Sequence, residues 1–195
     1  MIVRHSSSEE VTQPREVSCE TIDYLQWEVA GVHTTCIVNT ASIDVKEFTF
    51  ASRIENITGL DFDANKKVEY LPIFIHEKFP NLEALSAYDC SIKEISKESF
   101  KELNKLKVLW LSGNQIQKIE SDVFKDLTLL EIVDLSLNQI SSMKGDSFEG
   151  LKHLKAVGLK GNMCINQLFI GEDQLSTVDG IVTAKCAEAA TSIVT

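Results

Sequence analysis

The side chains in this 195-residue chain that could perform chemistry are its cysteines and histidines, and their spacing excludes several common sites. The four histidines are scattered, and none belongs to the H-E-x-x-H pattern of a zinc protease. No two cysteines have the C-x-x-C spacing of a structural zinc site. The chain also lacks a phosphate-binding loop, a dinucleotide-binding glycine pattern and a nucleophile elbow. We therefore expect no catalytic residue, no metal and no cofactor, and we interpret His33, His76 and His153 as solvated or locally satisfied.

The charge of the chain narrows the class of partner. The formal net charge is −10, whereas a nucleic-acid-binding protein needs a basic surface, so we expect no nucleic-acid partner. The same charge favours a basic protein partner. No apolar run approaches the roughly 20 residues of a membrane helix, so we expect no membrane insertion. The polar start has no apolar segment of the kind a signal peptide needs, which leaves open whether a signal was removed.

A sequence repeat indicates which elements would position the side chains. Residues 106–130 read L-x-x-L-x-L-x-x-N-x-I-x-x-I-x-x-x-x-F-x-x-L, and residues 130–154 repeat this pattern 24 residues later. The same frame appears in five coils, one of which carries an extra residue after Asn65. Each coil supplies one short strand and one return loop, and the strands stack in parallel. The coils begin at Ile57, Leu82, Leu106, Leu130 and Leu154.

Two further rows of residues would hold the coils together. An asparagine follows the strand in four coils, where its amide can bond backbone groups of its own and the next coil. A phenylalanine near the end of each coil would fill the convex side. Cys90 occupies the asparagine place in the second coil, and we expect it to be a buried free thiol, with a reactive or intermolecular role as the alternative. The two rows are Asn65, Asn114, Asn138 and Asn162, and Phe79, Phe100, Phe124 and Phe148.

The ends of such an array need covers, because neither open end can bury its own apolar face. We expect Cys19–Cys36 to link an N-terminal hairpin to the first strand and Cys164–Cys186 to fold the C-terminal segment over the last coil. The hairpin strands are predicted at residues 26–29 and 34–38. They lead into a degenerate first coil that begins at His33, 24 residues before Ile57, and is closed by Ile43 and by Phe48 or Phe50. The predicted organisation is a disordered tail at 1–17, an N-terminal cap with the degenerate coil at 18–56, the array at 57–163, a C-terminal cap at 164–186 and a tail at 187–195.

The repeat carries a family resemblance. The 24-residue period, the F-x-x-L ending and the cysteine-flanked caps resemble the typical extracellular leucine-rich repeat proteins, which include Toll-like receptor ectodomains and small leucine-rich proteoglycans. The N-terminal cap, with Trp27 between Cys19 and Cys36, resembles small secreted leucine-rich repeat proteins of insects. The resemblance implies an α/β-type solenoid, a right-handed curved stack of about five to six coils with a parallel concave sheet and an irregular convex side. It also implies secretion and, at the family level, innate immune or extracellular recognition.

Side chains that alternate with the core leucines would point out of the concave face. Trp110 is the one large residue that the repeat turns outward, so we expect it to lie at the centre of an apolar binding patch surrounded by carboxylates. The alternatives are a flat, neutral face and, more weakly, a calcium site at Asp61 and Asp63. The predicted ligand-binding residues are Tyr88, Trp110, Val108, Ile132, Asp134, Leu137, Asp61, Asp63 and Asp89.

Three functions remain open from the sequence. We favour a secreted, non-enzymatic module that binds a protein partner through the concave sheet. The carboxylates on that face favour a basic partner. A structural protein that associates with itself as a homodimer is the first alternative, and a cytoplasmic regulatory or scaffold protein is the second. The triplet that begins at Asn56 is an N-glycosylation sequon, so secretion would make a glycoprotein plausible.

Overall fold

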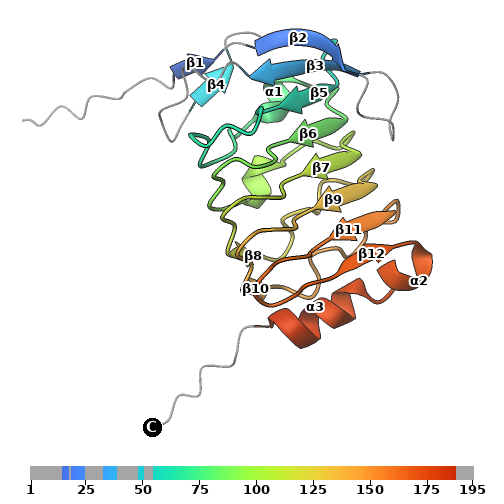
Figure 1. The fold of residues 1–195 in the computed structure, drawn as a ribbon. Coiled ribbons are helices and arrows are strands. Elements are labelled where there is room, and N and C mark those ends of the chain that lie inside the picture. Colours follow the sequence, from blue (N-terminus) through green and yellow to red (C-terminus); the bar gives the residue numbers. More distant parts are fainter. Residues whose placement is uncertain (1–14, 18, 25–32, 39–47, 51–54, 188–195) are drawn as a thin grey trace, which may run out of the picture.

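The computed structural model describes residues 15–17, 19–24, 33–38, 48–50 and 55–187, and it is a parallel-sheet solenoid (Figure 1). Short strands lie one above another, each followed by a return segment that leads to the next strand. Six of these strands are parallel, and their order in the sheet follows their order in the chain. They are β3 (His33–Val38), β5 (Gly59–Asp61), β6 (Ala84–Ser86), β7 (Val108–Trp110), β9 (Ile132–Asp134) and β11 (Ala156–Gly158).

The register of the parallel strands confirms the repeat. The fourth-position residues pair across the sheet: Leu60 with Leu85, Leu85 with Leu109, and Leu109 with Val133. The extra residue after Asn65 lies in the return segment of the first clear coil and leaves the strand pairing intact. Cys36 pairs with Leu60, so the strand of the degenerate coil predicted to begin at His33 belongs to the stack.

The N-terminal end of the sheet is closed by an antiparallel strand. This strand is β2 (Cys19–Tyr24), which pairs with β3 along its whole length. The hairpin was therefore predicted, but its first strand lies at residues 19–24, while the predicted strand at 26–29 lies outside the described residues. A second correction concerns the tail: β1 (Arg15–Val17) pairs in parallel with β4 (Phe48–Phe50), so order begins before residue 18. Three mostly polar residues carry no strand signal of their own, and only the pairing with β4 defines them.

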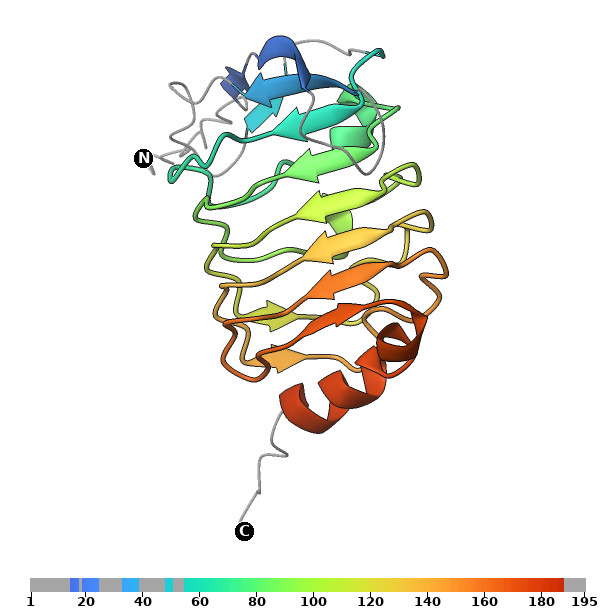
Figure 2. The same ribbon diagram turned by 45° about the vertical axis from the view of Figure 1, so that its right-hand side comes forward.

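The C-terminal end has a matching cover. After the last coil, β12 (Leu168–Ile170) turns back and pairs antiparallel with β11. The helices α2 (Glu172–Leu175) and α3 (Val178–Cys186) then lie across the end of the array, as Figure 2 shows. The predicted Cys164–Cys186 disulfide is present and ties α3 to the start of this segment. At each end of the sheet the last parallel strand is therefore paired with an antiparallel strand, and at the C-terminal end the helices also cover the array.

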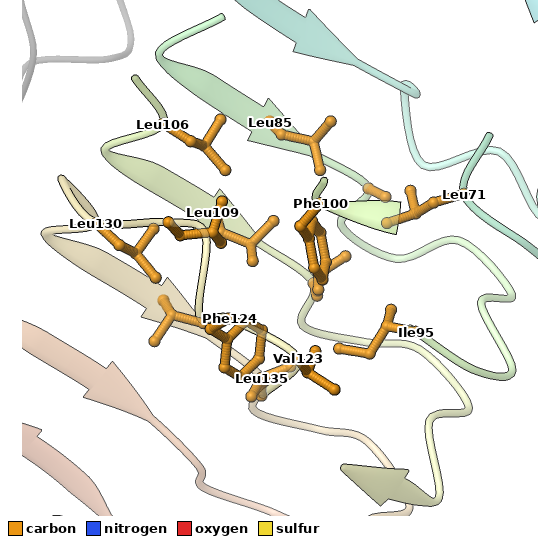
Figure 3. Close-up of a cluster of buried hydrophobic side chains, with 14 of the residues drawn as sticks. Leu71, Leu85, Ile95, Phe100, Leu106, Leu109, Val123, Phe124, Leu130 and Leu135 are labelled. Atoms are coloured by element: carbon orange, nitrogen blue, oxygen red, sulfur yellow. The ribbon is translucent and has the colours of Figure 1, made fainter. Parts of the chain in front are cut away.

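The core lies between the sheet and the return segments. Leu85, Leu109 and Leu106 point from the strand side toward Phe100 and Phe124 on the return side (Figure 3). All of these side chains are fully buried. The Phe100 and Phe124 rings have centroids 5.8 Å apart, and Phe124 and Phe148 stack at 5.7 Å. The phenylalanine row thus links successive coils on the return side.

The asparagine row forms a continuous hydrogen-bond ladder. The side-chain amide of Asn138 donates to the carbonyls of Leu111 in the preceding coil (2.9 Å) and Leu135 in its own (3.0 Å). Its carbonyl oxygen accepts the Ile116 N–H at 3.0 Å. Asn114 and Asn162 repeat this pattern one coil before and one coil after. Buried turns that would lose their backbone hydrogen bonds are satisfied in this way.

The remaining elements lie behind the sheet, on the return side (Figures 1 and 2). Two are short helices and two are strands that pair with each other in parallel. None of the helices in the described part of the chain is long and apolar enough to cross a membrane. The elements are α1 (Ile75–Lys78), the 3₁₀ helix η2 (Lys97–Ser99), β8 (Lys118–Ile119) and β10 (Ser142–Met143).

Candidate functional site

The sheet has one face that the core does not cover, here called the open face. Strand residues on either side of each core leucine project from it, because successive side chains on a strand alternate. Strand pairing places one residue from each coil in a row across this face. The central row contains Asp61, Ser86, Trp110 and Asp134. Each is the register partner of the next on the neighbouring parallel strand.

A hollow of about 440 Å³ lies over this row. Its floor is low because Ser86 and Ser112 are small and buried, whereas Tyr88 rises beside them with 52% of its surface exposed. Trp110 contributes to the wall, and carboxylates stand at both ends. The lining residues are Asp61, Asp63, Ala64, Ser86, Tyr88, Trp110, Ser112 and Asp134.

Trp110 lies lower on the face than the sequence predicts. It is half-buried, and it packs with Ile132 against Ala84 and Val108, in a small cluster separate from the main core. Val108 is only 1% exposed, so its predicted place in an exposed apolar patch is wrong. The reason is that the indole covers its small neighbours. Trp110 therefore lines the side of the hollow and packs against its neighbours; it does not project freely into solvent.

Two carboxylates of the hollow are held in the same way. Asp61 accepts the backbone N–H of Asp63 at 2.9 Å, and Asp134 accepts that of Ser136 at the same distance. Burial raises the pKa of the Asp61 carboxyl above its ordinary value, against the hydrogen bonds from Asp63 and Ser86, which lower it. The fold therefore holds a partly desolvated carboxylate here that it does not fully compensate.

Asp89, also predicted to surround the patch, is engaged elsewhere. Its carboxylate accepts a hydrogen bond from the Lys66 ammonium at 2.5 Å, and it does not line the hollow. The extra residue after Asn65 brings Lys66 to this place, which the repeat frame did not reveal. Among the described residues, no group of three or more His, Cys, Asp or Glu side chains could hold a metal ion, so the calcium alternative for Asp61 and Asp63 gains no support.

Exposed apolar side chains gather toward the C-terminal end of the open face. Leu137 is 64% exposed and has a left-handed backbone with φ of 55°. Leu168 and Ile170 of β12 are also exposed, and their pairing with Gly158 and Ala156 places them on the open face. The repeat predicts Leu137 on this face but does not predict Leu168 or Ile170, because β12 lies outside the repeat frame. Their alternation around a buried Phe169 was the available signal.

The remaining predicted residues lie away from the hollow. Asn56 is exposed, so the sequon is accessible, and its use stays a prediction. Cys36 is disulfide-bonded; the side chain of Cys19 lies outside the described ones, so that pairing stays a prediction. Cys90 is free and buried, and burial raises the pKa of its thiol to about 12. A thiol of that kind is unreactive at neutral pH.

Acidic residues elsewhere in the array are treated differently. At the second position of successive coils, Glu83 and Lys107 form an ion pair at 2.7 Å, and Glu131 and Lys155 form one at 2.6 Å. This alternation is not among the sequence predictions, although the second positions of the last four coils carry it. The fold therefore neutralises carboxylates at the margin of the sheet and leaves those of the hollow without a described basic neighbour.

Comparison with known proteins gives the family of the repeat. The leucine-rich repeat family model matches residues 80–140 and 111–164. Among solved structures, the chain is similar to Toll in the Toll–Spatzle complex, a hub of Drosophila development and innate immunity, with a TM-score of 0.53 and 26% identity over 60% of this chain and 16% of that chain. It is also similar to TLR13 in a complex with ssRNA13, with a TM-score of 0.60 and 25% identity over 77% of this chain and 20% of that chain.

The chain spans between about one-sixth and one-fifth of the length of those proteins. A second structure of the Toll–Spatzle complex, in glycosylated form, gives a TM-score of 0.52 with 25% identity over 60% of this chain. No curated protein matches the sequence.

Proposed function

Because the chain is a leucine-rich repeat protein that resembles the repeat arrays of Toll and TLR13, we propose that it is a non-enzymatic module that binds a protein partner through its open face. The observation that carries this proposal is the hollow over the central row of the sheet, with an exposed Tyr88 at its rim and exposed Leu137 beyond it. An exposed tyrosine is a typical anchor of protein interfaces, and an exposed apolar patch marks an interaction site.

The charge of the hollow favours a basic partner. Asp61, Asp63 and Asp134 line it, and the chain as a whole has a net charge of −10. Complementary charge steers association and excludes partners of like charge. TLR13 is bound to RNA in its complex, but a phosphate backbone would meet carboxylates on this open face, so a nucleic-acid ligand is not favoured here.

We place the protein outside the cell, in extracellular recognition and, at the family level, in innate immunity. Support comes from the Cys164–Cys186 disulfide, since disulfides persist in oxidising compartments. The similarity to Toll, whose complex with Spatzle belongs to development and innate immunity, points the same way. Mass spectrometry of the native protein without reduction tests this location, because free thiols at all five cysteines would contradict it.

The proposal is tested by capture of a partner. The immobilised chain is incubated with extracellular fluid of its source, and captured proteins are compared with those held by the double variant Tyr88→Ser, Leu137→Gly. We expect the variant to lose the partner. The matched control is Ile73→Ser, which removes an exposed apolar side chain from the return side. Equal capture by all three proteins would rule out the open face.

Self-association is the second candidate, because Leu168 and Ile170 leave β12 with an apolar surface. Light scattering over a range of protein concentrations tests it. If the measured mass is that of a monomer at every concentration, the homodimer is excluded. A dimer in the wild-type protein that becomes a monomer in Ile170→Ser would support it.

A further inference from the structure

We propose that the hollow binds an extended segment of the protein partner that carries two basic side chains four residues apart, one facing Asp61 and the other facing Asp134. This inference rests on the proposed function and adds the chemistry and spacing of the ligand. It uses the hollow, its aromatic walls and the strand register together.

The spacing follows from the register. Asp61 and Asp134 lie on β5 and β9, which are separated by β6 and β7, so three strand-to-strand steps divide them. At roughly 4.8 Å a step, the two positions are about 14 Å apart. An extended segment advances about 3.4 Å per residue, so four residues cover the same distance. Residues four apart also project from the same side of an extended chain.

The two carboxylates are suited to receive cations. Each uses one oxygen to accept a backbone N–H two residues later in its own coil, which orients the group, and both carboxylates line the hollow. Ser86 is a further donor to Asp61. No ion pair joins either carboxylate to a basic side chain among the described residues, whereas Glu83 and Glu131 at the sheet margin are both paired. A guanidinium or ammonium from a partner would supply the missing countercharge.

The walls and floor restrict the rest of the segment. Trp110 neighbours Asp134 in the register, so an arginine at that end could pair with the carboxylate and stack on the indole. The residue midway between the two basic positions would lie over the floor near Ser86, with Tyr88 and Trp110 beside it. We therefore expect an apolar residue at that place.

A synthetic peptide tests the spacing. The dye-labelled peptide SRTLTRS has its arginines four apart, with a leucine midway, and its binding is followed by fluorescence anisotropy up to millimolar protein. Two control peptides are SRTLRTS, in which the arginines are three apart and face opposite sides, and SQTLTQS, which is neutral. We expect SRTLTRS to bind at least tenfold more tightly than either. Equal affinity of the two arginine peptides, or no saturable binding of SRTLTRS, overturns the proposal.

Variants of the protein test the two ends separately. Asp61→Asn and Asp134→Asn keep an oxygen that can accept the backbone N–H, and each should weaken SRTLTRS by about tenfold. Glu98 is exposed on η2, on the return side. Glu98→Gln makes the same change in net charge and should weaken the binding of SRTLTRS less than twofold. An effect of Glu98→Gln equal to those of the aspartate variants would show general charge attraction only, and would overturn the proposal.

The outcome is distinguishable from failure of the proposed function. If Tyr88→Ser, Leu137→Gly abolishes capture of the natural partner while SRTLTRS shows no preference for spacing, the open face binds a protein but the two-cation segment is wrong. If capture is unchanged in that double variant, the proposed function itself fails.

Discussion

The asparagine ladder and the central row of the open face come from the same coils, a few residues apart, yet they differ in composition. The ladder repeats one residue, Asn114, Asn138 and Asn162, with the same hydrogen bonds each time. The central row changes at every step, from Asp61 to Ser86, Trp110 and Asp134. The coils act as an internal alignment. Positions that repeat hold the solenoid together, and positions that vary are free to recognise something else.

The largest expected effect is on the ladder. Asn138→Ala would leave the buried Ile116 N–H without its acceptor. It would also remove one of the two amide donors to each of the Leu111 and Leu135 carbonyls, which keep only their bonds from Asn114 and Asn162. We expect the free energy of unfolding, measured by urea denaturation, to fall by about 3 kcal/mol. The matched control is Ser136→Ala, on the open face of the same coil, which should change it by less than about 0.5 kcal/mol. Similar losses in both variants would remove the distinction between the two rows.

A smaller effect of opposite sign is expected at Leu137. Its left-handed backbone is unfavourable for a residue with a Cβ, and Gly113 and Gly161 occupy the equivalent position in the neighbouring coils. We expect Leu137→Gly to stabilise the protein by about 0.5–1 kcal/mol, while partner capture is weakened. Leu129→Gly, at a site that has no positive φ, should destabilise by a similar amount. A destabilised Leu137→Gly would mean that this leucine serves the fold.

The Asp61 carboxylate gives a prediction about pH. Burial raises its pKa, so the folded chain binds this proton more tightly than the unfolded chain does. The wild-type protein therefore loses stability as the pH rises from the ordinary pKa of an aspartate in the unfolded chain through the raised pKa of Asp61 in the folded chain. We expect Asp61→Asn to have a higher unfolding temperature than wild type at pH 7 and no such advantage at pH 3, by thermal melts. Glu98→Gln, which is exposed, serves as the control, and an equal pH dependence in both variants would contradict the assignment.

The smallest effect on stability is expected at Tyr88. Half of this side chain is exposed, so Tyr88→Ser should change the free energy of unfolding by about 0.5 kcal/mol or less. Its effect on partner capture should nevertheless be large, since the ring stands at the rim of the hollow. Urea denaturation and the capture assay, run on the same preparation, check both. If Tyr88→Ser strongly destabilised the protein but still captured the partner, Tyr88 would serve the fold and not recognition.

The repeat frame could be predicted because it depends on local spacing. Leucines and asparagines at constant intervals identified the strands, the register and the degenerate coil at Cys36, and they located the extra residue after Asn65. The covers were harder to predict. β1 has no strand pattern of its own, and the alternation in β12 covers only three residues, so each is defined mainly by the strand it pairs with.

The site could be predicted only in outline. Periodicity gives the direction of a side chain, and it placed Asp61, Tyr88, Trp110 and Asp134 on one face, where all four line the hollow. It cannot give exposure, which depends on the neighbours. Val108 is covered by a large side chain from its own strand, and Asp89 is engaged by Lys66. The first outcome depends on a contact within one coil, and the second on a contact between two coils.

Each coil adds one strand to the sheet, so distances across the open face are multiples of one strand spacing. Each added or deleted coil between β5 and β9 would change the separation of their end carboxylates by one strand step, about 4.8 Å, without altering either coil. A ligand's required spacing could therefore be reset by inserting a 24-residue unit, because the asparagine and phenylalanine rows accept another identical member. In such an architecture, gain or loss of a whole repeat retunes recognition in discrete increments that point substitutions cannot reach.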